Sequence, residues 1–219
     1  MGAEKSMNVN DEYLLRQGNT IAVTERTARY LAIKRFMDIL FALTGLLAAL
    51  PIMALFSILI CLESPGPAFY KQERVGKNGR PFHLYKLRSM KIDAEKSGAV
   101  WALKKDPRVT KVGAFIRRTR IDELPQLLNV LRGEMSLIGP RPERPVFTKQ
   151  FQAEIPGFTE RLAVKPGLSG WAQVNGGYDM TPREKLMFDL YYIRNLTFSL
   201  EVKIMIKTCK VIWTGDGAR

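Results

Sequence analysis

The chain has 219 residues, of which 34 are Lys or Arg and 21 are Asp or Glu, so its formal net charge is +13. This length suits one domain with attachments, and the charge implies an anionic partner such as nucleic acid, a phosphorylated substrate or acidic lipid. One histidine and two cysteines, Cys61 and Cys209 in apolar runs, argue against a zinc site, a disulfide framework and a histidine-based triad. They indicate a reducing cytoplasmic environment and chemistry based on oxygen ligands.

The N-terminal part of the chain contains a candidate membrane segment. Residues 1–25 are polar and lack an apolar run, so we interpret them as an arm. The segment Ile39–Leu62 then carries no charge over 24 residues. It starts too late for a secretory signal and lacks a small-residue cleavage site. At ~1.5 Å per residue, a helix of this length can cross the ~30 Å hydrocarbon core of a bilayer once.

Two features of this segment favour a helix that enters and leaves the same leaflet. Pro51 lies almost at its centre, where it removes one backbone hydrogen bond and bends the helix. Basic residues flank both ends equally, and the positive-inside rule then places both flanks on the cytoplasmic side. These residues are Arg26, Arg29, Lys34 and Arg35 before the segment and Lys71, Arg74, Lys77 and Arg80 after it. From the segment alone, a proline-kinked transmembrane helix is an equal alternative.

A β-hairpin is predicted after the apolar segment. Two short strand-like runs, residues 68–74 and 81–90, flank the turn Gly76–Gly79. Lys86 and Arg88 lie two residues apart, so strand alternation places both side chains on one side. They are candidate phosphate ligands, and a solvated strand edge is the other interpretation. Residues 91–105 are predicted as a helix and a loop.

A short helix is predicted in the middle of the chain. Its apolar face is formed by residues at positions i, i+3, i+4 and i+7, namely Leu124, Leu127, Leu128 and Leu131. Asp122 is predicted as its N-cap, which places Pro125 at the third helical position, where proline is tolerated. Gly133 stands where a C-terminal stop belongs.

The start of this helix is the candidate active site. Asp122 and Glu123 are adjacent, with arginines on both sides. Helix N-terminal amides with arginines suit phosphate, and adjacent carboxylates suit Mg²⁺ or a nucleophile. In the plainer interpretation Asp122 only caps the helix and Glu123 only complements its dipole, and the spacing alone favours that interpretation. The neighbouring arginines are Arg117, Arg118 and Arg120 upstream and Arg141 and Arg144 downstream.

The remaining signals lie in the C-terminal half. Residues 147–151 are predicted as part of a helix, and residues 165–170 as a Gly/Pro-rich loop. Thr181-Pro-Arg-Glu184 matches a capping box, so a helix is predicted to start there. Ser199–Trp213 is a largely apolar helix whose lysines form one stripe, at Lys203, Lys207 and Lys210. Given the membrane segment, a helix in the membrane interface is favoured over a core helix with outward lysines.

Several of these stretches together resemble a known family. They are FHLYKLRSM at 82–90, the long run DPRVTKVGAFIRRTRIDELPQLLNVLRGEMSLIGPRPE at 106–143, and KPGLSGWAQVNG at 165–176. With the proline-containing N-terminal helix, they resemble the bacterial sugar transferases, the monotopic phosphoglycosyl transferases, in their short form. The resemblance covers Lys34 to Trp213. The family often has Ser-Pro at the membrane bend, where this chain has Leu50-Pro51.

The resemblance implies a fold and a division of the chain. The expected fold is α+β and predominantly helical, with a re-entrant membrane helix and a small cytoplasmic catalytic domain that carries interfacial amphipathic helices. The expected segments are an N-terminal arm over residues 1–33, the membrane helix over 34–63, the catalytic domain over 64–213 and a tail over 214–219. Homodimerisation is plausible for such a protein.

The resemblance also implies an activity at the cytoplasmic face of the bacterial cell membrane. The family transfers a sugar-1-phosphate from a UDP-sugar to undecaprenyl phosphate and releases UMP, with Mg²⁺ as cofactor. This is the first membrane step in the synthesis of surface glycans such as exopolysaccharide, capsule or wall polymer. The match makes Asp122 the nucleophile, through a covalent phosphosugar intermediate, and Glu123 a metal ligand or proton carrier. Expected phosphate ligands are Arg117 and Arg141, with weaker matches at Lys86, Arg88 and Arg144.

Two other classes of function share parts of this pattern. A membrane-attached Mg²⁺-dependent hydrolase of phosphate esters would use the same carboxylates and arginines with water as acceptor. A basic, non-enzymatic lipid- or nucleic-acid-binding protein would explain the net charge. The sequence lacks an aromatic-studded RNA-binding strand or a basic recognition helix, so no nucleic-acid partner is expected. The identity of the sugar and the glycan pathway are not encoded in these motifs.

Overall fold

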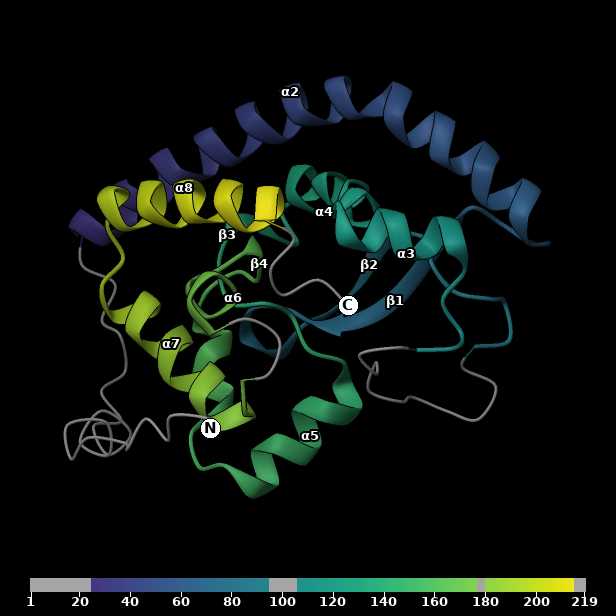
Figure 1. Cartoon of the computed structure of the whole chain (residues 1–219). Coiled ribbons are helices and arrows are strands. Elements are labelled where there is room, and N and C mark those ends of the chain that lie inside the picture. Colours follow the sequence, from purple (N-terminus) through teal and green to yellow (C-terminus); the bar gives the residue numbers. More distant parts are fainter. Residues whose placement is uncertain (1–24, 95–105, 177–179, 215–219) are drawn as a thin grey trace.

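The computed structural model describes residues 25–94, 106–176 and 180–214, and it shows an α+β fold in which helices predominate, as predicted (Figure 1). The helices are α2 (Glu25–Glu63), α3 (Lys111–Arg118), α4 (Gln126–Arg132), α5 (Pro145–Glu154), α6 (Trp171–Gly176), α7 (Pro182–Arg194) and α8 (Phe198–Thr214). The strands are β1 (Phe69–Val75), β2 (Pro81–Leu87), β3 (Ser136–Ile138) and β4 (Gly167–Ser169). Short 3₁₀ helices are η1 (Lys77–Gly79), η2 (Ile121–Glu123) and η3 (Phe158–Ala163). Residues 1–24 of the predicted arm and residues 95–105 of the predicted helix and loop lie outside the described residues. The predicted arm residues 25–33 belong to α2, and residues 92–94, predicted as helix or loop, form a turn.

The longest element, α2, is one continuous helix of 39 residues. It arches over the rest of the molecule with its convex side outward (Figure 1). The helix passes through Pro51 without ending, because a proline removes one backbone hydrogen bond and can be accommodated by a bend. The predicted pair of half-helices is therefore a single curved helix. Its stretch Arg29–Glu63 is long and apolar enough, by length and composition, to cross a membrane.

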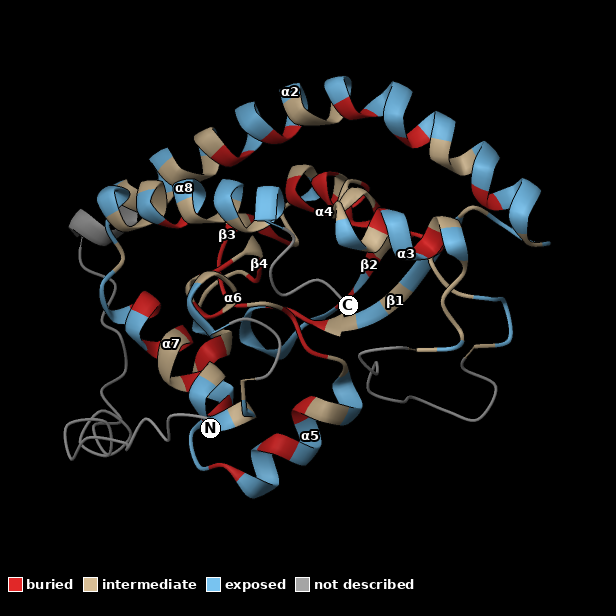
Figure 2. Cartoon of the chain, in the orientation of Figure 1, coloured by how far each residue is buried: buried red, intermediate tan, exposed pale blue. Residues whose placement is uncertain are grey.

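The outward face of α2 is apolar, whereas a surface helix of a soluble protein turns polar residues outward. Asp38 and Ala42 are buried against the domain, whereas Phe36, Leu47 and Leu62 are exposed (Figure 2). The other exposed large apolar residues of α2 are Ile33, Ile39, Leu40, Phe41, Leu43, Leu50, Ile52, Leu55, Ile58 and Leu59. A continuous exposed apolar surface of this kind marks contact with a membrane or a partner protein.

Polar side chains bind the first half of α2 to the domain. Arg35 donates hydrogen bonds to the carbonyls of Val130 and Leu131, at 2.6 and 2.9 Å, and so supplies donors to the carbonyls at the end of α4. The Asp38 carboxylate accepts from the Ser136 hydroxyl and from the next backbone amide in β3, both at 3.0 Å. The charged side chains of Arg35 and Asp38 therefore lie in the interface between α2 and the rest of the domain, although in the sequence they are next to the apolar segment.

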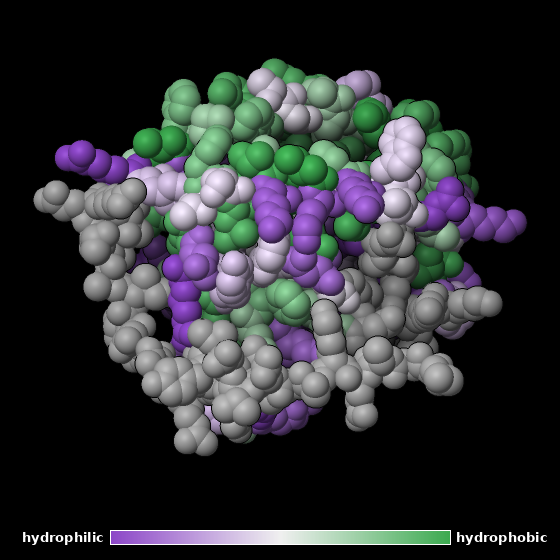
Figure 3. All heavy atoms as spheres, turned by 60° about the vertical axis from the view of Figure 1, so that its left-hand side comes forward, coloured by the Kyte–Doolittle hydropathy of each residue, from purple (hydrophilic) through white to green (hydrophobic). Residues whose placement is uncertain are grey.

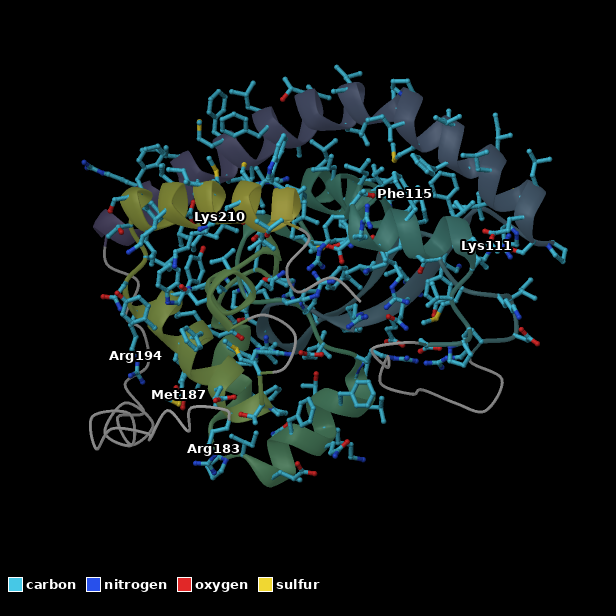
Figure 4. The ribbon with its side chains drawn as sticks, viewed as in Figure 1. Lys111, Phe115, Arg183, Met187, Arg194 and Lys210 are labelled. Atoms are coloured by element: carbon cyan, nitrogen blue, oxygen red, sulfur yellow. The ribbon has the colours of Figure 1, made fainter. Side chains whose placement is uncertain are left out.

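The second half of α2 packs on α3. The Phe56 and Phe115 rings stack with their centroids 5.6 Å apart, and Phe115 lies on the side of α3 that faces α2 (Figure 4). Glu63, the last residue of α2, accepts hydrogen bonds from the backbone amides of Lys111 and Val112. A carboxylate at that position satisfies free amides at the start of α3. Both halves of α2 are therefore attached to the domain.

The predicted hairpin is confirmed as β1 and β2, which pair antiparallel around η1. The register pairs Tyr70 with Lys86, and β2 ends at Leu87, three residues before the end of the predicted run. Phe82 and Leu84 lie two residues apart on β2 and are both buried. They share a core with Ala42, Leu127, Val130 and Met135. One hydrophobic core thus joins the hairpin, α4 and α2.

The Gly/Pro-rich run predicted as a loop contains the short strand β4. β4 pairs in parallel with β3, with Ser136 opposite Gly167. A β-carbon on Gly167 would lie 2.1 Å from the amide nitrogen of Gly139, so the two backbones can approach this closely only because both residues are glycine. Sequence patterns do not show this pairing, because a three-residue strand carries too little alternation.

The C-terminal helices follow the predictions. The helix predicted around residues 147–151 is confirmed as α5, and the helix predicted over Ser199–Trp213 is confirmed as α8. α7 starts at the predicted capping box, in which the side chains of Thr181 and Glu184 each accept from the other's backbone amide. α5, η3, α7 and α8 enclose a second hydrophobic core around Phe158, Leu186 and Tyr192.

Candidate active site

The two adjacent carboxylates lie in the 3₁₀ turn η2, between α3 and α4. Asp122 is not the N-cap of a helix, because α4 begins only at Gln126 and its N-cap residue is Pro125. The backbone before Pro125 forms the tighter i→i+3 bonds, such as that from the Leu124 amide to the Ile121 carbonyl. The predicted C-terminal stop is confirmed, since Gly133 has a φ of 81° and caps α4. The turn frees both carboxylates from a capping role.

Both carboxylates are buried beside cations. Glu123 forms ion pairs with Lys86, at 2.9 Å, and with Arg141, whose two terminal nitrogens contact its two oxygens. The Lys86 ammonium lies 3.6 Å from the second carboxylate, Asp122. Residues from β2, η2 and the segment after β3 therefore meet at one point. Glu123 thus has short contacts with both cations, whereas Asp122 has a longer contact with Lys86.

The surroundings push the pKa values of this pair apart. Burial raises the pKa of Asp122, which Lys86 opposes and the negative charge of Glu123 reinforces. Burial alone would also raise the pKa of Glu123, but Arg141 and Lys86 outweigh it and hold that pKa well below its usual range. Glu123 is therefore a fixed anion, whereas Asp122 is the more basic carboxylate. Such an asymmetry is typical of paired catalytic carboxylates with separate roles.

The segment that carries Arg141 is held by two other arginines, half-buried Arg74 and buried Arg161. Arg74 donates to the Pro142 carbonyl at 3.0 Å, and Arg161 donates to the Arg141 carbonyl at 2.9 Å. Arg161 also forms an ion pair with Asp189 at 2.6 Å. The prolines stiffen this segment, and the two guanidinium groups fix its carbonyls. No sequence pattern indicated the positioning role of Arg74 or Arg161, because both roles depend on contacts between distant segments.

The other predicted phosphate ligands lie at different distances from the carboxylate pair. Arg117, in the last turn of α3, acts on Asp122 through its charge. The Arg144 guanidinium lies 5.9 Å from the centre of the Phe147 ring. Arg88 donates to the carbonyls of the turn at residues 64–66, at 2.6 to 3.1 Å. Among the described residues no hydrogen bond or ion pair joins Arg88 to either carboxylate, so it fixes the chain after α2.

The carboxylate pair suits a Mg²⁺ ion that arrives with a phosphorylated substrate. No group of three or more potential metal-binding side chains occurs in the described ranges. Mg²⁺ is commonly bound by one or two carboxylates together with substrate phosphates and water, so two carboxylates are sufficient. Asp122 is the better ligand of the two, because Arg141 and Lys86 already occupy the oxygens of Glu123.

Comparison with known proteins gives the same family as the motifs. The family model described as bacterial sugar transferase matches residues 29–215. A Bacillus subtilis (strain 168) protein named putative undecaprenyl-phosphate N-acetylgalactosaminyl 1-phosphate transferase is 75% identical over 162 residues, which are 74% of this chain and 90% of that protein. An Aeromonas hydrophila protein named UDP-N-acetylgalactosamine-undecaprenyl-phosphate N-acetylgalactosaminephosphotransferase is 52% identical over 87% of this chain and 46% of its own length.

A more distant relative shows how far the similarity extends. The Escherichia coli (strain K12) protein named UDP-glucose:undecaprenyl-phosphate glucose-1-phosphate transferase is 41% identical over 80% of this chain and 39% of its own length. The chain thus spans less than half of the Aeromonas and Escherichia proteins, and nearly all of the Bacillus protein. The resemblance drawn from the motifs is confirmed: the chain belongs to the bacterial sugar transferase family and is a phosphoglycosyl transferase.

Proposed function

We propose that this enzyme transfers a sugar-1-phosphate from a UDP-sugar to undecaprenyl phosphate at the cytoplasmic membrane face and releases UMP. The observation that carries the proposal is the buried carboxylate pair, in which Asp122 is the more basic member and Glu123 is bound by two cations. The names of the relatives supply the lipid acceptor. The two relatives that are 75% and 52% identical are named for N-acetylgalactosamine, which makes UDP-N-acetylgalactosamine the first donor to test.

The proposed reaction has two steps at one phosphorus atom. A carboxylate oxygen of Asp122 bonds to the β-phosphorus of the donor while the bond to the bridging oxygen breaks, so UMP leaves with that oxygen. A phosphate oxygen of undecaprenyl phosphate then attacks the same phosphorus. The bond to Asp122 breaks, which yields the lipid diphospho-sugar and restores the carboxylate.

The charges around the carboxylate pair support this chemistry. A diphosphate brings negative charge next to an anionic nucleophile, and Arg141 and Lys86 offset that charge. Glu123 keeps both cations in position, which suits a positioning role better than a role in proton transfer. Mg²⁺ bound at Asp122 would neutralise further charge on the diphosphate. The raised pKa of Asp122 makes it a stronger nucleophile once it is ionised.

α8 also exposes apolar side chains, and this supports a position in the membrane interface. Met205, Ile206 and Trp213 are exposed on one side of α8. The ammonium groups of Lys203 and Lys207 lie on another side, 5.5 and 4.8 Å from the centre of the Trp171 ring. Figure 3 shows hydrophobic residues along the upper edge of the molecule, where α2 lies, and hydrophilic residues below. This separation is typical of helices that lie in the plane of a bilayer surface.

A donor panel tests the proposed reaction. Purified enzyme with Mg²⁺ and undecaprenyl phosphate should release UMP from UDP-N-acetylgalactosamine faster than from UDP-glucose, as measured by a coupled UMP assay. The first turnover can release UMP without lipid phosphate, because the phosphosugar remains on Asp122. Every later turnover must require undecaprenyl phosphate. Continuous release without any lipid phosphate would contradict the proposal and favour the phosphate-ester hydrolase.

The proposed re-entrant topology has its own test. In a variant that lacks both native cysteines, Arg29→Cys and Glu73→Cys place single thiols at exposed positions before and after the apolar segment. Both thiols should be protected from a membrane-impermeant thiol reagent in intact cells and react after the cells are permeabilised. Labelling of one of them in intact cells would show that α2 spans the bilayer.

A further inference from the structure

A second group of cations lies at the opposite end of α4 from the carboxylate pair. A β-carbon placed on Gly133 would lie 3.4 Å from a terminal nitrogen of Arg35 and 3.4 Å from the Lys165 ammonium. The two groups come from α2 and from the run before β4, and they face the same point. Lys77, at the start of η1, also acts on Lys165 through its charge. We call Arg35, Lys77 and Lys165 the Gly133 cation cluster.

The positive charge of this cluster is poorly balanced. Burial lowers the pKa of Lys165, and the charges of Arg35, Lys77 and Lys34 lower it further, against one opposing carboxylate, Asp38. Asp38 already accepts two hydrogen bonds from β3, and Lys34 has its own ion pair with Glu201 at 2.7 Å. In the part of the chain that the structure describes, no carboxylate oxygen lies within 4.0 Å of the three cluster cations.

Arg35 is fixed in place while part of its guanidinium stays available. Its two hydrogen bonds to the end of α4 hold the group beside Gly133. A guanidinium has five N–H donors, so these two bonds do not use up its capacity. The Arg35 guanidinium is therefore pre-positioned beside Gly133, which reduces the entropy cost of binding an anion there.

The cluster lies beside the start of the uncharged segment of α2, which is where lipid phosphates are expected when that segment enters a membrane. Arg35 precedes the uncharged segment, which begins at Ile39, by one helical turn. On the outward face of the same turn, Ile33 and Phe36 are exposed, so this part of α2 presents apolar side chains outward and cations inward. Basic pockets beside membrane helices on the cytoplasmic side suit the headgroups of anionic lipids.

We propose that the Gly133 cation cluster binds the phosphate of an anionic phospholipid of the cytoplasmic leaflet, at a site separate from the carboxylate pair. This proposal rests on the proposed function only in requiring that α2 contacts the membrane. A bound phosphodiester would offset the mutual repulsion of Arg35, Lys77 and Lys165 and would connect α2, η1 and the run before β4. The lipid would fix the tilt of the domain on the membrane.

Native mass spectrometry of the full chain in detergent tests this site without any sugar donor. Phosphatidylglycerol should bind at one site more tightly than phosphatidylcholine. Lys165→Gln and Lys77→Gln should each weaken that binding about five-fold, which corresponds to ~1 kcal/mol per lysine. Lys149→Gln, which removes an exposed lysine of α5, is the matched control and should bind like the wild type.

Three results would overturn the proposal. Equal weakening by Lys149→Gln would mean that only the overall net charge attracts the lipid. Equally tight binding of phosphatidylcholine would show that the site has no preference for an anion. Competition by inorganic phosphate at the same concentration as the lipid would assign the cluster to free phosphate.

A folding control accompanies these measurements. The cluster variants must retain the wild-type thermal unfolding midpoint in detergent alone. Lys77 is exposed, so Lys77→Gln provides a second readout if Lys165→Gln unfolds.

Discussion

Asp122→Asn should reduce multiple-turnover UMP release on the order of 10⁴-fold or more, the scale expected when a nucleophile is lost. Asparagine has nearly the same shape as aspartate, but it offers no carboxylate oxygen to the β-phosphorus. Wild-type enzyme incubated with donor alone should gain the mass of one phosphosugar on Asp122, as measured by intact-protein mass spectrometry. The variant should gain none.

Asp93→Asn is the matched control for this substitution, since Asp93 is exposed. It should keep wild-type turnover and the phosphosugar adduct. Full turnover in Asp122→Asn, or an adduct on any other residue, would contradict the covalent mechanism. Family membership would be unaffected by that result, because it rests on the match over residues 29–215.

Arg161→Met should lower the free energy of unfolding by about 3–5 kcal/mol, because it leaves a buried carboxylate without a partner. Arg161 and Asp189 are both almost fully buried, at 3% and 1% exposure, and they form two hydrogen-bonded contacts. The same guanidinium bonds the Arg141 carbonyl, so activity should fall as well. Denaturant unfolding in detergent measures the loss of stability.

A double substitution separates the charge effect from packing. Arg161→Met with Asp189→Leu removes both ions, and replacing a buried pair by apolar residues is often close to neutral. The double variant should therefore be more stable than Arg161→Met alone. If both variants lose the same stability, the pair with Asp189 is not the cause, and the other contacts of Arg161, with the Arg141 carbonyl, Glu143 and the Phe158 ring, would account for the loss.

Local sequence signals predicted the elements whose causes are local. The capping box at Thr181, the glycine stop at Gly133 and the hairpin turn each depend on a few neighbouring residues, and all three are confirmed. The prediction that Asp122 is a helix N-cap was wrong, because it treated Pro125 as the third residue of a helix. The chain instead completes a 3₁₀ turn before Pro125 and then starts α4.

Long-range contacts explain what the sequence did not predict. Strand alternation placed Lys86 and Arg88 together, but β2 ends at Leu87, so the alternation stops before Arg88. Arg35 was noted only as a basic residue before the apolar segment, and Asp38 was not singled out, although they bind α4 and β3. The sequence did name four residues that the structure brings together, and these are Lys86, Asp122, Glu123 and Arg141. Their roles in catalysis stay predictions.

The shared core of α2 and the hairpin has a practical consequence for biochemical work. Ala42 of α2 is completely buried against Phe82, Leu127 and Met135. A fragment that starts after α2, made to obtain a soluble catalytic domain, would expose this core to water and leave the carbonyls at the end of α4 without their Arg35 donor. Such a fragment should misfold or aggregate, so detergent or a lipid disc has to accompany the enzyme through purification and assay.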